Sequence, residues 1–305
     1  MPAQDTIPAV HTDPFSIETL RDPQPFQRAL REAGEFAFLP TYGIWATGRY
    51  DRVRDILSDW QTFRSSGGVG LINFHKEKPW RRPSLLLEND PPAHTHYRAV
   101  MLRALSPVVL RELRPAFARE AEMQVERLLQ IRRFDAVKEL AEGYPLKVFG
   151  DAVGVQATDR TNLLRYGDIS FNALGPRNEL FHAAMEQAEP VSQWIMAQCE
   201  RDELDPNGLG AIMYAAADAG DVIEDEAGML VRSFLSAGVD TTVRALGAAL
   251  LAFSEDPQQW QILKENPSLA RAAAEEAIRY ASPFQTVFRT AAQNVELNGV
   301  RLAAD

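Results

Sequence analysis

This sequence has a single cysteine, no long apolar run and no excess of positive charge. Its 305 residues include one cysteine, Cys199, which excludes an internal disulfide framework and fits a reducing cytoplasm. No segment reaches the roughly 18 uninterrupted apolar residues expected of a membrane span, and the first twenty residues hold no apolar block long enough for a signal peptide. The formal charge of −10 argues against nucleic acid or an anionic membrane as partner. We therefore expect a cytoplasmic globular protein that binds neither.

Helical periodicity dominates the sequence from Pro92 onward. Apolar residues recur at helical spacing in AHTHYRAVMLRAL, in PVVLRELRPAFAREAEMQVERLLQ and around residues 158–172. The segment NELFHAAMEQAEPVSQWIMAQCERD continues the pattern, but its Pro190 should bend or interrupt the helix. RYDRVRDILSD, DPQQWQILKEN and PSLARAAAEEAIRYA predict further helices, the last two with proline near the first turn. The pattern as a whole predicts about ten helices.

Strand signals are few and lie near the two ends of the sequence. EFAFLP and YGIWAT predict two short strands around Pro40 and Thr41. VELNGVRL predicts a hairpin, because Asn298-Gly299 fits a two-residue turn. Residues 1–25 are expected to be irregular and residues 64–92 to form a loop. Without an internal repeat or a linker, residues 1–305 are expected to form one mainly-α domain with a small β component.

A polar insert interrupts the most apolar stretch, LVRSFLSAGVDTTVRALGAALLAF. Gly238 leaves the backbone open to close approach, and Thr241 can bond the carbonyl of Ala237 and bend the helix. Asp240, beside them, could relay protons from solvent. A bent helix with a hydroxyl, a carboxylate and a bare backbone patch suits proton delivery to a small buried reactant. The alternative is that Gly238 is a helix–helix contact and Asp240 lies on the solvent face.

Two further motifs place charged residues at helical spacing. Glu276 and Arg279, in EEAIRYASP, are three residues apart and can pair, although a surface ion pair would be worth little. His94 and Arg98, in NDPPAHTHYRAVM, share one helix face and can both donate to an anion, although two solvated basic residues would show the same spacing. His94 and His96 point about 200° apart on a helix, so no metal site is predicted there.

These three motifs, in this order over residues 88–290, resemble those of cytochrome P450 monooxygenases. SAGVDTT resembles the oxygen-activation motif (A/G)Gx(D/E)TT in the long central I helix of that family. EEAIRYASP carries its ExxR pair, and DPPAHTHYR resembles the DPPxHxxxR opening of its C helix. The resemblance implies a mainly-α cytochrome P450 fold, here incomplete, with a long central I helix and haem b as cofactor.

The resemblance also assigns roles to the polar insert. Asp240 and Thr241 would be the acid and alcohol that deliver protons during oxygen activation. Gly238 would leave room for dioxygen over the haem.

Further roles on either side of the haem follow from the other two motifs. His94 and Arg98 would reach a haem propionate, as would Arg289 in SPFQTVFRT. Glu276 and Arg279 would form a buried structural bridge behind the haem.

The similarity extends to bacterial P450s that oxidise para-substituted benzoates, through SSGGVGL, EKPWRRPSLLLE and FNALGP. It implies a substrate pocket lined by the loop 65–74, Arg232 to Asp240, Phe171, Leu174, Phe284 and Val287. The benzoate-oxidising relatives tend to carry arginine where this chain has Gly67, so one cation is absent.

Three residues of the polar helix could hold a substrate carboxylate. Arg232 supplies a cation, and Ser233 and Ser236 supply hydroxyls; Ser236 is four residues after Arg232 and shares its face. The alternative for Arg232 is a side chain that reaches along the surface to solvent without touching substrate.

The thiolate that ligates haem iron in the family comes from a late FxxGxHxCxG loop, which this sequence does not contain. Cys199 lies in MAQCERDE and is expected to be an ordinary thiol. Residues 1–305 are therefore expected to correspond to the N-terminal three quarters of a P450 domain. The sequence is compatible with two functions. One is a monooxygenase that oxidises a small organic substrate, with an aromatic acid as candidate, using O2 and electrons from a ferredoxin and its reductase. The other is a non-catalytic fragment with weak or no haem binding.

Overall fold

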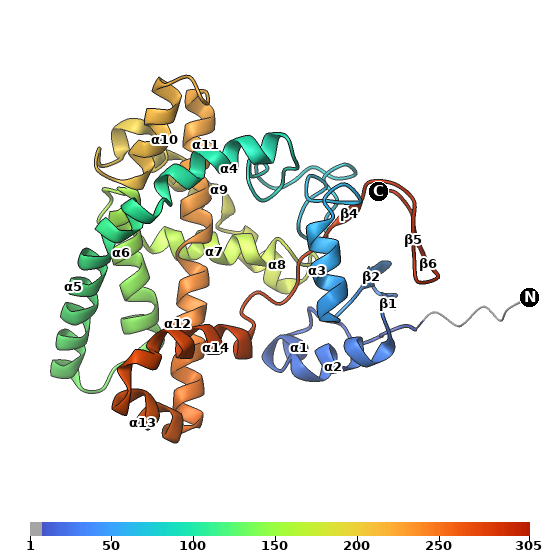
Figure 1. Cartoon of the computed structure of the whole chain (residues 1–305), viewed down its shortest axis with the longest axis horizontal. Helices are drawn as coiled ribbons and strands as arrows, with labels where there is room; N and C mark the ends of the chain where they lie inside the picture. Colours follow the sequence, from blue (N-terminus) through green and yellow to red (C-terminus); the bar gives the residue numbers. More distant parts are fainter. Residues whose placement is uncertain (1–7) are drawn as a thin grey trace, which may run out of the picture.

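The computed structural model describes residues 8–305 and is built mainly from helices (Figure 1). The helices of its first half are α1 (Ile17–Arg21), α2 (Gln24–Ala33), α3 (Tyr50–Ser58), α4 (Ala93–Ala104), α5 (Pro107–Ile131), the π-helix η1 (Val137–Glu142), α6 (Gly143–Val153) and α7 (Thr161–Asn172). Those of its second half are α8 (Glu179–Met185), α9 (Ala188–Ala197), α10 (Leu209–Asp218), α11 (Glu224–Ala237), α12 (Asp240–Glu255), α13 (Pro257–Glu265) and α14 (Ala270–Ala281), with short 3₁₀ turns at Arg201–Glu203 and Pro267–Leu269. The predicted mainly-α fold is confirmed.

The N-terminal part is a small unit beside the main helical body (Figure 1). Strands β1 (Ala37–Leu39) and β2 (Ile44–Ala46) pair antiparallel, as predicted. The expectation of an irregular arm over residues 1–25 is wrong where α1 forms, because the hydroxyl of Ser16 accepts from the amide of Thr19 and caps that helix. Residues 1–7 of that expected arm lie outside the described residues.

Two further strand pairs involve the C-terminal segment. Strand β3 (Phe63–Arg64) pairs antiparallel with β4 (Thr290–Ala291), so the segment after α14 returns to the loop that precedes α4. Strands β5 (Val295–Leu297) and β6 (Val300–Leu302) form the predicted hairpin. Asn298 and Gly299 both have positive φ, 47° and 81°, as a type I′ turn requires.

Pro190 interrupts its helix as predicted, and the break falls four residues earlier. Helix α8 ends at Met185 and α9 begins at Ala188. A proline ring inside a helix collides with the carbonyl four residues before it, and that carbonyl belongs to Glu186. The two short helices therefore replace the single long one that the apolar pattern alone would give.

Helices α11 and α12 form a column through the helical body (Figure 1). They are separated only at Gly238 and Val239. The hydroxyl of Thr241 donates to the carbonyl of Ala237 over 2.7 Å, and that of Thr242 donates to the carbonyl of Gly238 over 2.9 Å. Hydroxyls that bond the preceding turn bend helices, so the predicted bend at Thr241 is confirmed.

The stretch Glu224–Glu255 is the one part of the described chain long and apolar enough, at a mean hydropathy of 1.3, to cross a membrane. Its first half, α11, lies in the hydrophobic core of the fold. Leu230, Val231 and Leu235 of α11 are at most 1% exposed, and the column packs against α6, α7, α10 and α14. This burial fixes the position of the polar insert relative to the rest of the fold.

Gly238 packs against α6. A Cβ atom on Gly238 would lie 2.0 Å from the Phe149 ring, so the missing side chain makes room for that ring. The expectation that Gly238 leaves space for dioxygen over the haem is therefore corrected. Its bare side is filled by Phe149, as in the alternative that treated this glycine as a helix–helix contact.

We predict that Gly238→Ala destabilises the protein by about 1–3 kcal/mol, because the new methyl group overpacks the contact with Phe149. Gly247→Ala, also in α12, is the matched control, since nothing lies within 4 Å of its Cβ position. The control should be neutral or stabilising by up to about 1 kcal/mol, the helix preference of alanine over glycine. Urea unfolding of the two variants measures both effects, and equal behaviour would contradict the packing role.

Candidate functional site

One face of the α11–α12 column is open. Ser233 is half-buried, while Ala237 and Thr241, each four residues further on, are exposed. The opposite face is closed, since Leu235 and Val239 are at most 1% exposed. The oxygen of Thr241 is thus fixed by its bond to Ala237 and lies at a surface accessible to a small molecule.

Asp240 lies on the other side of the same turn, toward α7. It is 9% exposed, so the alternative that placed it on the solvent face is wrong. A Cβ on Gly167 of α7 would lie 2.6 Å from the Asp240 Cβ, so this second glycine lets the two helices meet. Asp240 also borders a cleft of about 280 Å³. The acid therefore has access to solvent from the side of the column away from Thr241.

Two basic residues of α4 are unpaired. His94 is half-buried and Arg98 is exposed, and within residues 8–305 neither side chain makes a hydrogen bond or an ion pair. The Nε2–H of His96 donates to the carbonyl of Asp221 over 2.8 Å. The two histidines thus point to different surroundings, as their helical spacing predicts.

Arg289 lies in the segment that leads into β4 and is half-buried. Its guanidinium donates to the carbonyl of Phe288 over 2.7 Å. Burial lowers its pKa, and the nearby carboxylate of Asp90 opposes that shift. The carbonyl of Asp90 accepts from the amide of His94, which places Arg289 near the start of α4. His94, Arg98 and Arg289 are thus three basic residues without a carboxylate partner at bonding distance in the described chain.

The predicted pair of Glu276 and Arg279 is present on α14, with two contacts of 2.7 Å. Its expected burial is not present, because the two side chains are 61% and 69% exposed. No element among residues 8–305 covers this face of α14. As an exposed pair it contributes little to stability here.

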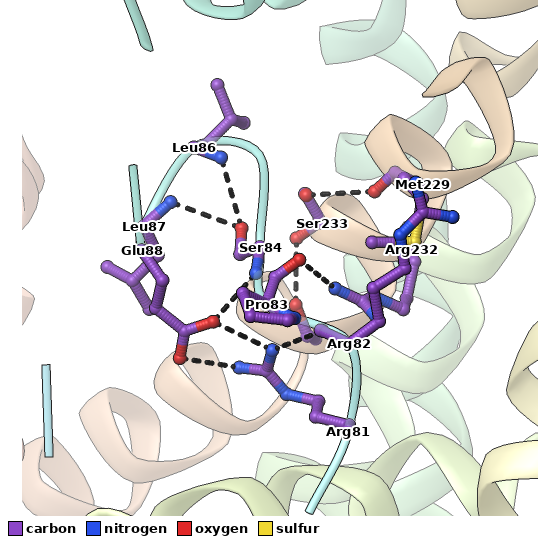
Figure 2. A network of polar contacts seen from close by, with 11 residues as sticks. Arg81, Arg82, Pro83, Ser84, Leu86, Leu87, Glu88, Met229, Arg232 and Ser233 are labelled. Atoms are coloured by element: carbon purple, nitrogen blue, oxygen red, sulfur yellow. Dashed lines mark hydrogen bonds and ion pairs between the residues drawn. The ribbon is translucent and has the colours of Figure 1, made fainter. Parts of the chain in front are cut away.

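A buried polar network joins the segment before α4 to α11 (Figure 2). Arg81 forms a two-pronged ion pair with Glu88, over 2.9 and 3.1 Å, and the Glu88 side chain is 3% exposed. The amide of Ser84 donates to the same carboxylate over 2.7 Å. Sequence reasoning missed this pair, because the two residues lie in a loop where no periodicity brings them together.

Arg232 completes the network from α11. It is 4% exposed, so the alternative of a solvent-reaching side chain is wrong. Its guanidinium donates to the carbonyl of Pro83 over 3.3 Å (Figure 2), and burial lowers its pKa. Within residues 8–305 it has no carboxylate within 4 Å. Since Glu88 neutralises Arg81, the network keeps one uncompensated positive charge.

The two serines near Arg232 lie on the half-buried side of α11. The hydroxyl of Ser233 donates to the carbonyl of Met229 over 3.0 Å, and that of Ser236 to the carbonyl of Ser233 over 3.2 Å. Neither serine bonds Arg232 in the described chain. Their oxygens keep lone pairs for a donor, and the helix carbonyls hold their protons.

The end of α7 meets the loop 65–74. The carbonyl of Leu174 accepts from the amide of Leu71 over 2.8 Å. Phe171 meets Phe284 edge to face, with ring centroids 5.6 Å apart, and Val287 is 36% exposed. Of the apolar residues predicted to line a substrate pocket, Phe171 and Phe284 are thus in contact, and Leu174 contacts the loop 65–74.

Gly67 of that loop lies against Thr290 of β4. A Cβ on Gly67 would lie 2.3 Å from the Thr290 hydroxyl oxygen. A larger side chain would therefore require the loop or β4 to move, which gives a physical reason for glycine at this position.

Cys199 is buried at 1% exposure, and its carbonyl accepts from the hydroxyl of Tyr214 of α10. Burial raises the pKa of its thiol to about 12. A neutral thiol enclosed in the core cannot reach a ligand on the open face, as expected for an ordinary cysteine.

Comparison with known proteins agrees with this arrangement. No protein-family model matches the sequence. The chain is 46% identical over 297 residues to cytochrome P450 CYP199A2 of Rhodopseudomonas palustris, covering 97% of this chain and 72% of that protein. It is 26% identical to the steroid C26-monooxygenase of Mycolicibacterium smegmatis, covering 85% of this chain and 62% of that one.

Solved structures show the same fold. The P450 haem domain of Tepidiphilus thermophilus superposes with a TM-score of 0.79 at 26% identity, covering 97% of this chain and 74% of that domain. CYP109Q5 of Chondromyces apiculatus gives a TM-score of 0.72 at 26% identity, over 95% of this chain and 73% of that one. Fold and sequence together define a P450-type haem protein. The chain belongs to the cytochrome P450 family, whose enzymes are haem-dependent monooxygenases.

The residues present fit haem on two sides. The guanidinium groups of Arg98 and Arg289 and the ring N–H of His94 can donate to its two propionates, and the open face at Ala237 and Thr241 suits its oxygen-binding side. The axial thiolate of the family is not provided by Cys199.

We predict that Cys199 resists thiol reagents at pH 8.5 in the native protein and reacts fully once the chain is unfolded in urea. The reason is its burial and its pKa of about 12, against about 8.5 when exposed. The thiol of the unfolded chain ionises at a lower pH than that of the folded chain. The contribution of the buried neutral thiol to folding stability is therefore fully present below about pH 8.5 and is lost as the pH rises toward the pKa of the folded state. The reaction is followed by absorbance with a disulfide reagent that releases a coloured product. Rapid labelling of the native protein would contradict the prediction, because it would show an accessible thiol.

Proposed function

We propose that this chain provides the distal half of a haem-thiolate monooxygenase site, which oxidises a small organic acid, with a substituted benzoate as the best candidate. The observation that supports it most is the open face at Thr241, together with the buried Asp240 at the preceding position of the column. The hydroxyl and the carboxylate lie on opposite sides of one turn, one at an open surface and one at the border of a cleft. That arrangement suits a proton path through the helix.

His94, Arg98 and Arg289 would hold the haem by its propionates. Arginine is the better partner for a carboxylate, because its planar fork can donate two parallel hydrogen bonds. When bound, haem supplies the activation of dioxygen, and the residues of this chain orient the group and manage protons and substrate.

Asp240 and Thr241 divide the handling of protons. Thr241 donates its own proton to the carbonyl of Ala237, which fixes the hydroxyl and leaves the oxygen lone pairs toward the open face. Asp240 can exchange protons with water in the cleft. General acid catalysis by a positioned group contributes about 10²–10⁴-fold to a rate.

A monoanionic substrate is favoured by the charge of the buried network. Arg81 and Arg232 carry two positive charges and Glu88 one negative charge, so one carboxylate would complete the balance. A buried charge without a partner is costly, and Arg232 bonds only the neutral carbonyl of Pro83. Ser233 and Ser236 on the same helix would add hydroxyl contacts, and the Phe171, Leu174 and Val287 side chains would contact the apolar part of the substrate.

The proposal includes separate electron-transfer partners, a ferredoxin and its reductase, and a cytoplasmic location. The similarity to a bacterial P450 supports the separate electron-transfer partners, and the single buried cysteine supports the cytoplasmic location. The acidic charge of the chain supports the absence of nucleic-acid and membrane partners.

Thr241→Ala in the haem-loaded enzyme tests the proton role. We expect oxygen consumption to continue while product formed per O2 falls by at least about tenfold, because the hydroxyl oxygen that accepts and positions the delivered proton is lost. Parallel oxygen-electrode and product assays give this ratio. Thr242→Ala is the control, since its hydroxyl also bonds the preceding turn and adds no proton role. Unchanged coupling in Thr241→Ala would refute the assignment.

Arg232→Met tests the anion site. A hydrogen bond to a charged group is worth about 1.5–3 kcal/mol, so the affinity for 4-methoxybenzoate should fall roughly 10–100-fold. The affinity for the neutral 4-methylanisole should stay the same. Stability should hold, because apolar replacement of a buried charge is often neutral. Calorimetry on the purified protein separates the two ligands, and an equal loss for both would show a packing role only.

A further inference from the structure

Asp240 has one ion-pair partner in the described chain, and it lies on the same helix. The Nε of Arg244 is 2.7 Å from the Oδ2 of Asp240, with side chains 41% and 11% exposed. Because the carboxylate of Asp240 is largely buried, this pair is screened less by water and salt than a pair on the surface. The contact also fixes the direction of the carboxylate.

The guanidinium of Arg244 also rests on an aromatic ring. Its central carbon lies 4.8 Å from the centroid of Phe171, within cation–π range. Phe171 in turn packs edge to face with Phe284. Arg244 is thus held between the proton-handling acid on one side and, on the other, the apolar side chains that line the proposed substrate pocket.

The rest of the surroundings of Asp240 leave one direction open. Gly167 of α7 meets its Cβ, so the carboxyl group is pressed close to that helix. The bordering cleft is lined by polar side chains from several elements, namely Glu142, Arg165, Asp168 and Gln187. Arg165 already donates to Asn162, and Asp168 accepts from Asn172. Arg244 thus fixes Oδ2 of Asp240, while Oδ1 lies on the side of Gly167 in a residue that borders the cleft.

We propose that Arg244 is a positioning residue for proton delivery, which holds Oδ2 of Asp240 from its seat on Phe171 and leaves Oδ1 to take protons from water in the cleft. This inference rests on the proposed function and deepens it. Because Phe171 lines the substrate pocket in that proposal, a bound substrate that shifts this ring also shifts the seat of Arg244. Proton delivery is thereby linked to occupancy of the pocket.

The ion pair itself is tested in the protein without haem. A double-mutant cycle of Asp240→Asn and Arg244→Gln is measured by urea unfolding at low and high salt. We expect the second substitution to shift the unfolding midpoint clearly less than it does in the wild-type background, and the coupling to shrink in salt. Additive midpoints at both salt concentrations would overturn the contact and the proposal with it.

The positioning role is tested in the haem-loaded enzyme with Arg244→Gln, Arg244→Lys and the control Arg271→Gln. Arg271 forms an i,i+4 pair of 2.9 Å with Glu275 on α14, so the control removes the same kind of pair away from Asp240. We expect Arg244→Gln to lower product formed per O2 several-fold and to raise the solvent deuterium isotope effect, with substrate KM unchanged. Arg244→Lys should recover part of the loss, and Arg271→Gln should change nothing.

The outcomes separate the two proposals. If the wild-type enzyme forms product and Arg244→Gln couples oxygen to product equally well, the positioning role is wrong and the proposed function stands. If the haem-loaded wild-type enzyme forms no product from any small organic acid, the proposed function fails, and the role of Arg244 fails with it.

Discussion

The rest of the site depends on the contact between Gly238 and Phe149. That contact brings α6 against the column at the point where α11 ends and α12 begins, and Thr241 and Thr242 bond back across the break. Leu230, Val231 and Leu235 bury the column on one side, so the break cannot turn freely. Because α12 starts at Asp240, the acid and the hydroxyl are presented on different sides of a fixed turn. The chemistry proposed here follows from that fixed geometry.

Several positive side chains around this column have no carboxylate partner in the described chain, which supports the proposal of anionic ligands. One positive charge remains unbalanced in the buried network of Arg81, Glu88 and Arg232, where a partner would be most valuable. Within residues 8–305, Arg98 and Arg289 also have no carboxylate at bonding distance. In a protein with a net charge of −10, these cations support the proposal of anion sites. A haem group with two propionates and an acidic substrate would fill both.

Much of the fold could be predicted from the sequence, because periodicity reports burial directly. The helices around His94, Pro107 and Glu276, and the Asn298-Gly299 hairpin, follow from local patterns. Helix α1 was missed because its cap at Ser16 is a single side-chain contact. The roles of Gly238 and Gly167 depend on Phe149 and Asp240, which meet them only after folding, so sequence alone left the role of Gly238 open.

The site residues that stand in short helical motifs could be predicted from the sequence, and those in an irregular loop could not. Asp240, Thr241 and the pair of Glu276 and Arg279 stand in short motifs with helical spacing. The exposure of that pair was not predictable, because burial depends on which elements cover α14. The link between Arg81 and Glu88 crosses an irregular segment. The ion pair of Arg244 with Asp240 could have been predicted, because the two residues are four apart, the spacing at which opposite charges on a helix meet.

The central claim is that the unpaired cations of this chain hold a haem group by its propionates. Titration of the 305-residue protein with haem, followed by the Soret absorbance, tests it most directly when the wild type is compared with Arg98→Gln/Arg289→Gln and with Arg271→Gln. We expect saturable one-to-one uptake that is clearly weakened by the double substitution and unchanged by the control. Absence of uptake, or equal uptake by all three proteins, would contradict it.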